Sequence, residues 1–304
     1  MTARAGRAVR LTIPLEMAGL RLDQALARLL PGESRSRLAR LIEEGHVRVD
    51  GEPAASRRKL KSGESVDVAL VARPVDEAFL PEAIALAVVH EDDDVLVVDK
   101  PPGLVVHPGS GNWAGTLLNA LLHHAPATAS LPRAGIVHRL DKDTSGLLVV
   151  AKNEAAQAEL VRQLQARSVK RTYVALVRGH LEAPATVDAP IGRHPVHRTR
   201  MAVVASGKPA VTHLRVREAF ARHTLLECDL ETGRTHQIRV HLASIGHPIE
   251  GDPVYGGRGE RLLPRQALHA WKLAFRHPRT GEAMRFEAPL PADLRALLAR
   301  LRAP

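Results

Sequence analysis

Residues 135–151 read GIVHRLDKDTSGLLVVA, which places two carboxylates in a polar turn directly before an apolar run. The run from Leu147 to Ala151 predicts a buried strand. A carboxylate held in a loop at the start of such a strand is rigid enough to act as a nucleophile or a base. Asp141 is therefore a candidate catalytic residue. The alternative is a turn in which Asp141 and Asp143 only accept hydrogen bonds from backbone amides.

The run Asp141-Lys142-Asp143-Thr144 also fits the D-x-D-x-T pattern of aspartyl-phosphate phosphatases. Those enzymes need a further acidic pair downstream to hold magnesium. The acidic run of this chain, residues 91–94, lies upstream instead. His138 and Arg139 also interrupt the apolar strand that should lead into such a motif. The phosphatase hypothesis is therefore the weaker one.

A second polar segment, residues 230–241, reads LETGRTHQIRVH. Its alternating pattern predicts a strand over 237–242. Arg239 is a candidate partner for a buried carboxylate, whose pKa would rise without one. His236 and His241 are five positions apart and no third ligand is evident, so we expect no metal site.

A third segment, residues 168–179, carries one of the two tyrosines, Tyr173, in a strand pattern after the basic residues Lys170 and Arg171. Packing in the core is the default interpretation of this tyrosine. In an RNA enzyme, the same ring could stack on an extruded base.

Composition indicates the kind of partner. The 304 residues carry a formal charge of +10, which attracts polyanions such as nucleic acids. The single cysteine, Cys228, predicts a buried strand residue and fits a reducing cytoplasm. Neither a signal peptide nor a membrane-spanning stretch is evident. We therefore expect a cytoplasmic protein without a membrane partner.

The N-terminal part combines helical spacing with basic clusters. Apolar residues recur over 22–30 and again over 38–42, where Ser34 can cap the second helix. The first basic cluster is Arg35, Arg37 and Arg40, and the second is Arg57, Arg58, Lys59 and Lys61. Each cluster is either a solvated surface or a binding site for RNA phosphates.

These patterns divide the chain into a basic N-terminal segment (1–17), a small domain of helices and short strands (18–75), a linker (76–87) and a large domain (88–304). Short turns between the large domain's strands favour an α+β fold on a mixed, largely antiparallel sheet with flanking helices and a central cleft. The expected strands are 85–89, 95–98, 147–151, 173–177, 210–215, 224–230 and 237–242. The expected helices are 116–124, 154–166 and 292–302.

Two resemblances follow from these segments. Residues 18–70 resemble an S4 RNA-binding domain (αL-type), through Arg21-Leu22-Asp23, 34–42, 45–51 and 63–66. From about residue 88 onward the chain resembles the RluA-type pseudouridine synthases, and within them the RluD-like branch. The matching motifs are 100–103, 107–112, 118–123, 138–141, 144–146, Lys170 with Tyr173, 207–213, 233–239, 251–256 and 265–270.

The resemblance implies that Asp141 acts on a flipped-out uridine, either by attacking C1′ or by removing the C2′ proton. It implies that Tyr173 stacks on the base and that Arg239 keeps Asp141 charged. Arg139 would fill the gap in the RNA and Ile238 would pack beneath the base. The remaining residues expected around the base or the RNA are His138, Thr144, Lys170, Arg234, His236, Arg35, Arg37 and Arg40.

The resemblance further implies a monomer without metal or organic cofactor that modifies large-subunit ribosomal RNA at helix 69, free or in a pre-ribosomal 50S particle, and that does not act on DNA. Two alternatives remain open. One is an RluC-like synthase acting on other ribosomal or transfer RNA uridines. The other is a catalytically inactive S4-type RNA-binding protein.

Overall fold

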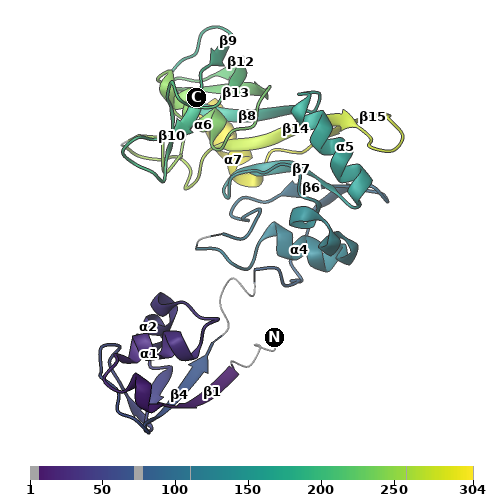
Figure 1. Ribbon diagram of the computed structural model, residues 1–304. Helices are drawn as coiled ribbons and strands as arrows, with labels where there is room; N and C mark the ends of the chain where they lie inside the picture. Colours follow the sequence, from purple (N-terminus) through teal and green to yellow (C-terminus); the bar gives the residue numbers. More distant parts are fainter. Residues whose placement is uncertain (1–6, 72–77, 110, 258, 304) are drawn as a thin grey trace. The chain divides into compact units, whose positions relative to one another are not determined.

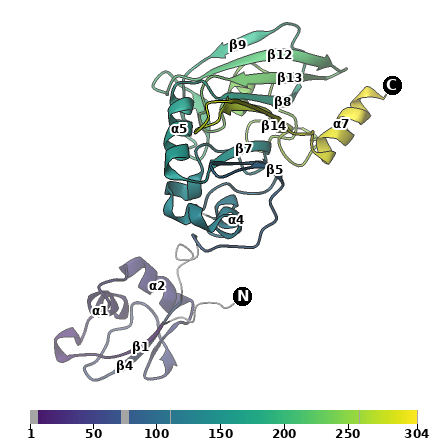
Figure 2. The ribbon, with the colours of Figure 1, turned by 90° about the vertical axis from the view of Figure 1, so that its right-hand side faces the viewer.

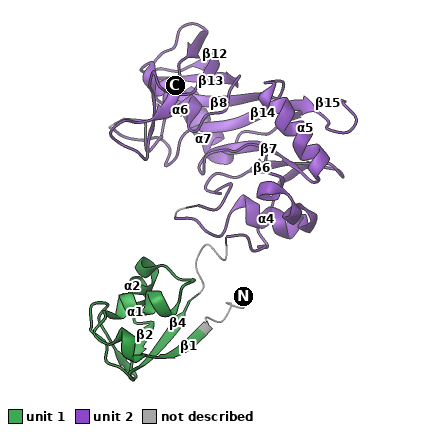
Figure 3. Ribbon diagram, in the orientation of Figure 1, with its two compact units in different colours: residues 1–77 green, residues 78–304 purple. Residues whose placement is uncertain are grey.

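The computed structural model describes residues 7–71, 78–109, 111–257 and 259–303. The chain divides into two compact units, 1–77 and 78–304 (Figure 3). Of the expected linker 76–87, residues 76 and 77 lie outside the described residues. Residues 78–87 pack on the second unit instead of forming a free linker. The Asn119 side chain donates hydrogen bonds to the carbonyls of Ala78 and Leu80, at 3.2 and 2.8 Å.

The first unit is an antiparallel four-stranded sheet, in the order β1-β4-β2-β3, with two helices (Figure 1). The helices and the sheet share one core, which includes Leu22, Leu38 and Val66. Ser34 caps α2 as predicted, because its hydroxyl accepts a hydrogen bond from the backbone N–H of Arg37 at 3.3 Å. The elements are β1 (Arg7–Thr12), α1 (Leu22–Leu29), α2 (Arg35–Glu43), β2 (Val47–Val49), β3 (Glu52–Pro53) and β4 (Ser65–Leu70).

The expected basic segment over residues 1–17 does not stand apart from this unit. Its residues 7–12 form β1, which pairs antiparallel with β4, and Ile13 is buried in the core. Val9, Leu11 and Ile13 alternate with more polar residues, which is the period of a strand. Residues 1–6 lie outside the described residues.

The second unit is built on a nine-stranded sheet in the order β5-β6-β7-β14-β8-β13-β12-β9, with β15 on β14. Among its described pairs only β7 and β14 are parallel, so the expected mixed, largely antiparallel sheet is confirmed. A separate hairpin pairs β10 with β11. The strands are β5 (Val88–Glu91), β6 (Val95–Lys100), β7 (Ser145–Ala151), β8 (Lys170–Arg178), β9 (Ala185–Asp188), β10 (Ile191–Arg193), β11 (Met201–Val203), β12 (Val211–Ala219), β13 (His223–Leu230), β14 (Leu268–Arg276) and β15 (Ala283–Glu287).

Helices cover both faces of this sheet (Figure 2). The helix α5 (Glu154–Gln165) packs on one face, against Val95 and Val149. The helices α4 (Leu117–His124) and α7 (Ala292–Arg302) pack in the other core, with Leu96 and Val150. Because β6 and β7 are buried on both sides, their sequences are continuous apolar runs rather than alternating ones. Within the described ranges, every helix is too short or too polar to cross a bilayer.

Asp141 lies in the loop directly before β7, where this strand meets β14 in the parallel pair. Gly146 makes the close approach possible. Its φ is 111°, and a Cβ at this position would lie 2.2 Å from the carbonyl oxygen of Ala270. Only glycine fits such a contact in this backbone conformation. The glycine that ends the polar turn therefore fixes where the loop with Asp141 emerges from the sheet.

The expected strand over 237–242 is wrong, because these residues belong to the helix α6 (Gln237–Ser244). Ile238, Val240 and Leu242 alternate as in a strand, but the residues between them are buried as well. A helix that is buried on all sides loses the 3.6-residue period that would have identified it. Its polar side chains are satisfied inside the fold; His241, for example, contacts the Thr212 hydroxyl and the Ala189 carbonyl.

Candidate active site

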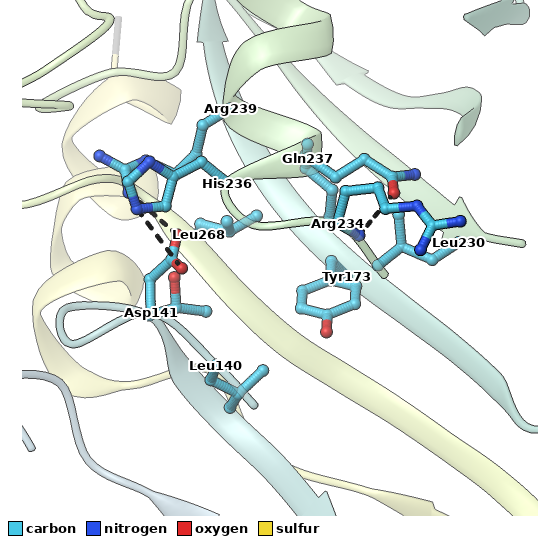
Figure 4. A pocket seen from close by; sticks show the side chains of 11 residues that line it. Leu140, Asp141, Tyr173, Leu230, Arg234, His236, Gln237, Arg239 and Leu268 are labelled. Carbon is cyan, nitrogen blue, oxygen red and sulfur yellow. Dashed lines mark hydrogen bonds and ion pairs between the residues drawn. The ribbon is translucent and has the colours of Figure 1, made fainter. Parts of the chain in front are cut away.

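Asp141 forms an ion pair with Arg239, which reaches it from α6. The Asp141 Oδ2 to Arg239 Nη1 distance is 2.9 Å. Arg239 also donates two hydrogen bonds, from Nε and Nη2, to the two carboxylate oxygens of Asp252, at 2.7 and 3.0 Å. The Arg239 and Asp252 side chains are 5% and 0% exposed, whereas Asp141 is 16% exposed. The buried salt bridge with Asp252 thus fixes the Arg239 side chain. Its Nη1 points at the more accessible carboxylate of Asp141 (Figure 4).

The protonation states follow from this arrangement. Burial would raise the pKa of Asp252, but the hydrogen bonds and the charge of Arg239 outweigh it and hold that pKa below its ordinary value. Burial would lower the pKa of Arg239, yet Asp252 and Asp141 together raise it above its ordinary value. Arg239 is therefore a permanent cation beside Asp141.

His236 also lies beside Asp141. It has a left-handed backbone, with φ 57°, immediately before α6, and its Nε2 lies 3.8 Å from Asp141 Oδ1. Its Nδ1 lies 2.9 Å from the Tyr255 hydroxyl, which itself accepts the backbone N–H of Met201 at 2.9 Å. Burial lowers the pKa of His236, although the charge of Asp141 opposes the shift. The imidazole is therefore neutral at pH 7.

Tyr255 decides where that neutral ring carries its proton. A backbone N–H can only donate, so the Tyr255 oxygen acts as its acceptor and the hydroxyl proton remains available for His236 Nδ1. When the Tyr255 hydroxyl donates to Nδ1, the proton of His236 sits on Nε2, which faces Asp141. Tyr255 is thus a positioning residue that orients an N–H toward the candidate catalytic carboxylate.

We expect Tyr255→Phe to lower the turnover rate at saturating substrate about fivefold to tenfold, because both tautomers of His236 become accessible. The KM for the substrate should stay within about a factor of two, since Tyr255 acts through His236. Rates measured as a function of substrate concentration check this prediction. A rise in KM at an unchanged turnover rate would contradict it.

Tyr173 lies across the pocket from Asp141 (Figure 4). It is 6% exposed, and burial raises the pKa of its phenol, so the hydroxyl stays protonated at neutral pH. The alternation of β8 places Arg171, not Lys170, on the same side as Tyr173. Lys170 is exposed at the start of the strand and does not line the pocket. The sequence could have indicated this, because Arg171 stands two positions before Tyr173 in a predicted strand and therefore shares its side.

The other predicted pocket residues divide into two groups. Ile238 and Thr144 are buried and line the pocket with Asp141, and Arg234 lies at its edge. Arg139 and His138 do not line this pocket; they line a larger adjacent cleft, with a volume of about 850 Å³, that also contains Arg234. The residues lining the pocket beside Asp141 are Leu140, Asp141, Thr144, Tyr173, Leu230, Arg234, His236, Gln237, Ile238, Arg239 and Leu268.

Lys100 stabilises the loop that carries Asp141 through hydrogen bonds to backbone carbonyls. It is 1% exposed, and its ammonium donates hydrogen bonds to the carbonyls of Pro101, Leu104 and Lys142, at 2.8, 3.0 and 2.9 Å. Three carbonyl acceptors match the three N–H groups of a charged lysine, although burial lowers its pKa to about 7. The contact with Lys142 fixes the residue directly after Asp141.

The acidic run 91–94 does not reach this pocket, as far as the described residues show. Asp92 and Asp94 lie beside His277 instead, with ligand-type atoms within 4.8 Å of one another. Asp94 Oδ2 already lies 2.7 Å from Arg279 Nε, and Asp92 Oδ2 lies 2.8 and 3.2 Å from the imidazole nitrogens of His90 and His277. The phosphatase hypothesis thus lacks the acidic pair it requires near Asp141.

In the first unit the two basic clusters meet at the start of α1. Arg21 and Arg35 both pair with the buried carboxylate of Asp23, at 3.0 and 2.8 Å. The backbones of Arg21 and Lys59 form an isolated antiparallel β-bridge, so residues 57–61 lie next to the start of α1. Of the predicted RNA contacts, Arg35 and Arg40 are 51% and 60% exposed. Arg37 is only 13% exposed and engages Glu33 and the Val71 carbonyl, so it is the least available of the three.

Comparisons with known proteins agree with this architecture. The family model described as RNA pseudouridylate synthase matches residues 94–244, and the S4 domain model matches 20–66. A ribosomal large subunit pseudouridine synthase D of Nitrosomonas europaea is 59% identical over 302 residues, which cover 97% of this chain and 88% of that protein. The protein of the same name from Pseudomonas aeruginosa is 53% identical over 306 residues, covering 95% and 94%. Among solved structures, human RNA pseudouridylate synthase domain containing 1 matches with 30% identity and a TM-score of 0.56, over 73% of this chain and 97% of that one.

The S4 domain and the sheet with its carboxylate pocket define an RNA-modifying enzyme. The chain belongs to the RNA pseudouridylate synthase family, and it is a pseudouridine synthase, an isomerase.

Proposed function

We propose that this enzyme converts specific uridines of large-subunit ribosomal RNA into pseudouridine, with Asp141 as the catalytic carboxylate. The observation that carries the proposal is the Asp141–Arg239 ion pair, 2.9 Å long, at the edge of a pocket that also holds the Tyr173 ring. The names of the relatives from Nitrosomonas europaea and Pseudomonas aeruginosa support the choice of RNA.

The reaction breaks the bond between uracil N1 and ribose C1′ and forms one between C5 and C1′. Asp141 either attacks C1′ or removes the C2′ proton, and the bond to N1 breaks with its electrons going to the uracil. After the uracil turns over, C5 bonds to the sugar, Asp141 is regenerated, and the C5 proton leaves to solvent while N1 gains one. The isomerisation balances without an external reactant, so we propose no cofactor and no metal.

Arg239 stabilises the ionised form of Asp141 before it attacks C1′ or accepts the C2′ proton, and again once Asp141 is regenerated, because the charge of Arg239 is itself held by Asp252. The uracil lies against the Tyr173 ring, with Ile238 beneath it, since both are buried at the pocket wall. Arg139, in the adjacent cleft, occupies the space that the flipped nucleotide leaves in the RNA. Thr144, Arg234 and His236 complete the pocket.

The first unit supplies further contacts to the RNA. The exposed arginines around α1 and α2, with residues 57–61, offer several positive charges to the phosphate backbone. A monomer in the cytoplasm acting on ribosomal RNA, and not on DNA or a membrane, is the form that we propose. We propose helix 69 as the target, because the motifs 107–112, 118–123 and 208–213 are similar to those of the RluD-like branch.

Mapping pseudouridines after incubation with an unmodified transcript of large-subunit ribosomal RNA tests this function. We expect new pseudouridines within the helix 69 sequence and none in transfer RNA. Modification elsewhere in ribosomal or transfer RNA would move the target to the RluC-like alternative. Binding without any modification would support the inactive S4-type protein instead.

A further inference from the structure

The larger cleft beside the catalytic pocket has the composition of an anion site. Its volume is about 850 Å³, and Arg234 lines both cavities, so the two are adjacent there. Among its described lining residues one side chain is acidic, Glu231, which is engaged by Arg167 and His213. The arginines lining it are Arg133, Arg139, Arg167, Arg171 and Arg234.

Two of these arginines have an unfavourable backbone conformation. Arg133 and Arg167 have φ values of 56° and 57°, in the left-handed region that favours glycine. Arg133 lies in a turn with Ala134 at φ 51° and Gly135 at φ 77°, and this turn packs closely on β7. Arg167 follows α5 directly, at the position where glycine usually ends a helix. Strained non-glycine residues of this kind cluster at functional sites.

The cleft also contains buried donors that lack acceptors. The backbone N–H of Val149 donates to His138 Nε2 at 3.1 Å, so the neutral imidazole carries its proton on Nδ1. Burial and the charge of Arg171 lower the pKa of His138 to about 3, which keeps the ring neutral. Within the described part of the chain, His138 Nδ1 and Arg171 Nε are buried without a hydrogen-bond partner. Both belong to residues of the cleft wall, and a buried donor normally has an acceptor.

We propose that this cleft binds the ribose–phosphate backbone of the RNA strand next to the uridine in the catalytic pocket, with Arg133 and Arg167 as its phosphate-binding residues. The inference rests on the proposed function, because it takes the ligand to be the same RNA. Phosphodiester oxygens supply the negative charge that a cleft lined by five arginines and one glutamate lacks. Arg133 and Arg167 occupy positions where glycine would relieve the backbone.

The test uses the full-length chain with Asp141→Asn, so that RNA binds without turnover. Binding of an unmodified large-subunit ribosomal RNA transcript is measured at several salt concentrations, with Arg133→Gly and Arg167→Gly added singly. We expect each to bind about fivefold to tenfold more weakly and to lower the slope of log Kd against log salt by about 0.7–1. The Tm should be unchanged or higher, because glycine adopts the left-handed backbone without strain.

Arg300→Ala is the matched control, since it removes one exposed positive charge on α7, outside the cleft. Equal affinities and slopes for Arg133→Gly, Arg167→Gly and Arg300→Ala would overturn the proposal. Weaker binding together with a lower Tm would also overturn it, because the arginines would then serve the fold. If the wild-type chain bound the transcript but formed no pseudouridine, the proposed function would fail. The affinities of the arginine variants and their salt dependence could still be compared.

Discussion

Asp141→Asn is expected to reduce pseudouridine formation at least about a thousandfold. Asparagine keeps the size of the side chain and can still accept the hydrogen bond that Arg239 Nη1 donates over 2.9 Å. It provides neither a negative charge nor a group that attacks C1′ or accepts the C2′ proton. Chemical mapping or mass spectrometry of ribosomal RNA after long incubation measures the loss. Wild-type levels of modification would exclude Asp141 as the catalytic residue.

Asp143→Asn is the matched control, because it removes a second carboxylate from the same loop. Asp143 does not line the pocket, and its backbone carbonyl accepts the Arg265 hydrogen bond that any residue would keep. We expect its activity to stay within about threefold of the wild type. An aspartyl-phosphate phosphatase would require both aspartates of the D-x-D-x-T pattern. The pair of variants therefore tests the enzyme class as well as the residue.

Arg239→Met is expected to abolish activity and to lower the free energy of unfolding by about 3–5 kcal/mol at pH 7. The substitution leaves the buried carboxylate of Asp252 without its two charged hydrogen bonds. The remaining donors to Asp252 are the backbone N–H groups of Val254 and Tyr255. These cannot neutralise a buried charge. Denaturant unfolding measures the difference.

The loss of stability caused by Arg239→Met should become smaller as the pH falls. In the wild type Arg239 holds the pKa of Asp252 below 3.8, so this carboxylate contributes stability above that pH and loses it as the pH falls further. In the variant, burial raises the pKa of Asp252 instead, so the penalty grows as the pH rises above about 3.8 and fades below it. The gap between wild type and variant should therefore narrow toward pH 4.

Adding Asp252→Asn to Arg239→Met should recover part of the lost stability, because the buried charge is removed together with its partner. Activity should not return, since Asp141 still lacks its cation. A double variant as unstable as Arg239→Met alone would show that the cost arises from the lost packing of the arginine. Unfolding curves of the two variants at pH 7 decide between these causes.

The order of segments in the sequence was enough to predict two domains, a mixed sheet and a carboxylate loop before β7. These features depend on local patterns. The apolar run after Gly146 is continuous because β7 is buried on both faces, and the helices α4, α5 and α7 have distinct periodic stretches. Cys228 is buried in a strand as predicted.

The sequence by itself determined that Asp141, Tyr173 and Arg239 belong to one enzyme family, but only the tertiary structure decided what each of them touches. Arg239 is 98 positions from Asp141 and reaches it from a helix whose alternating residues had predicted a strand. Asp252 and Tyr255 belong to the matching motif 251–256, but the sequence assigned them no role. Arg133 and Arg167 lie outside all of the matching motifs. Contacts of this kind depend on side chains that distant elements bring together, and no local pattern of residues encodes them.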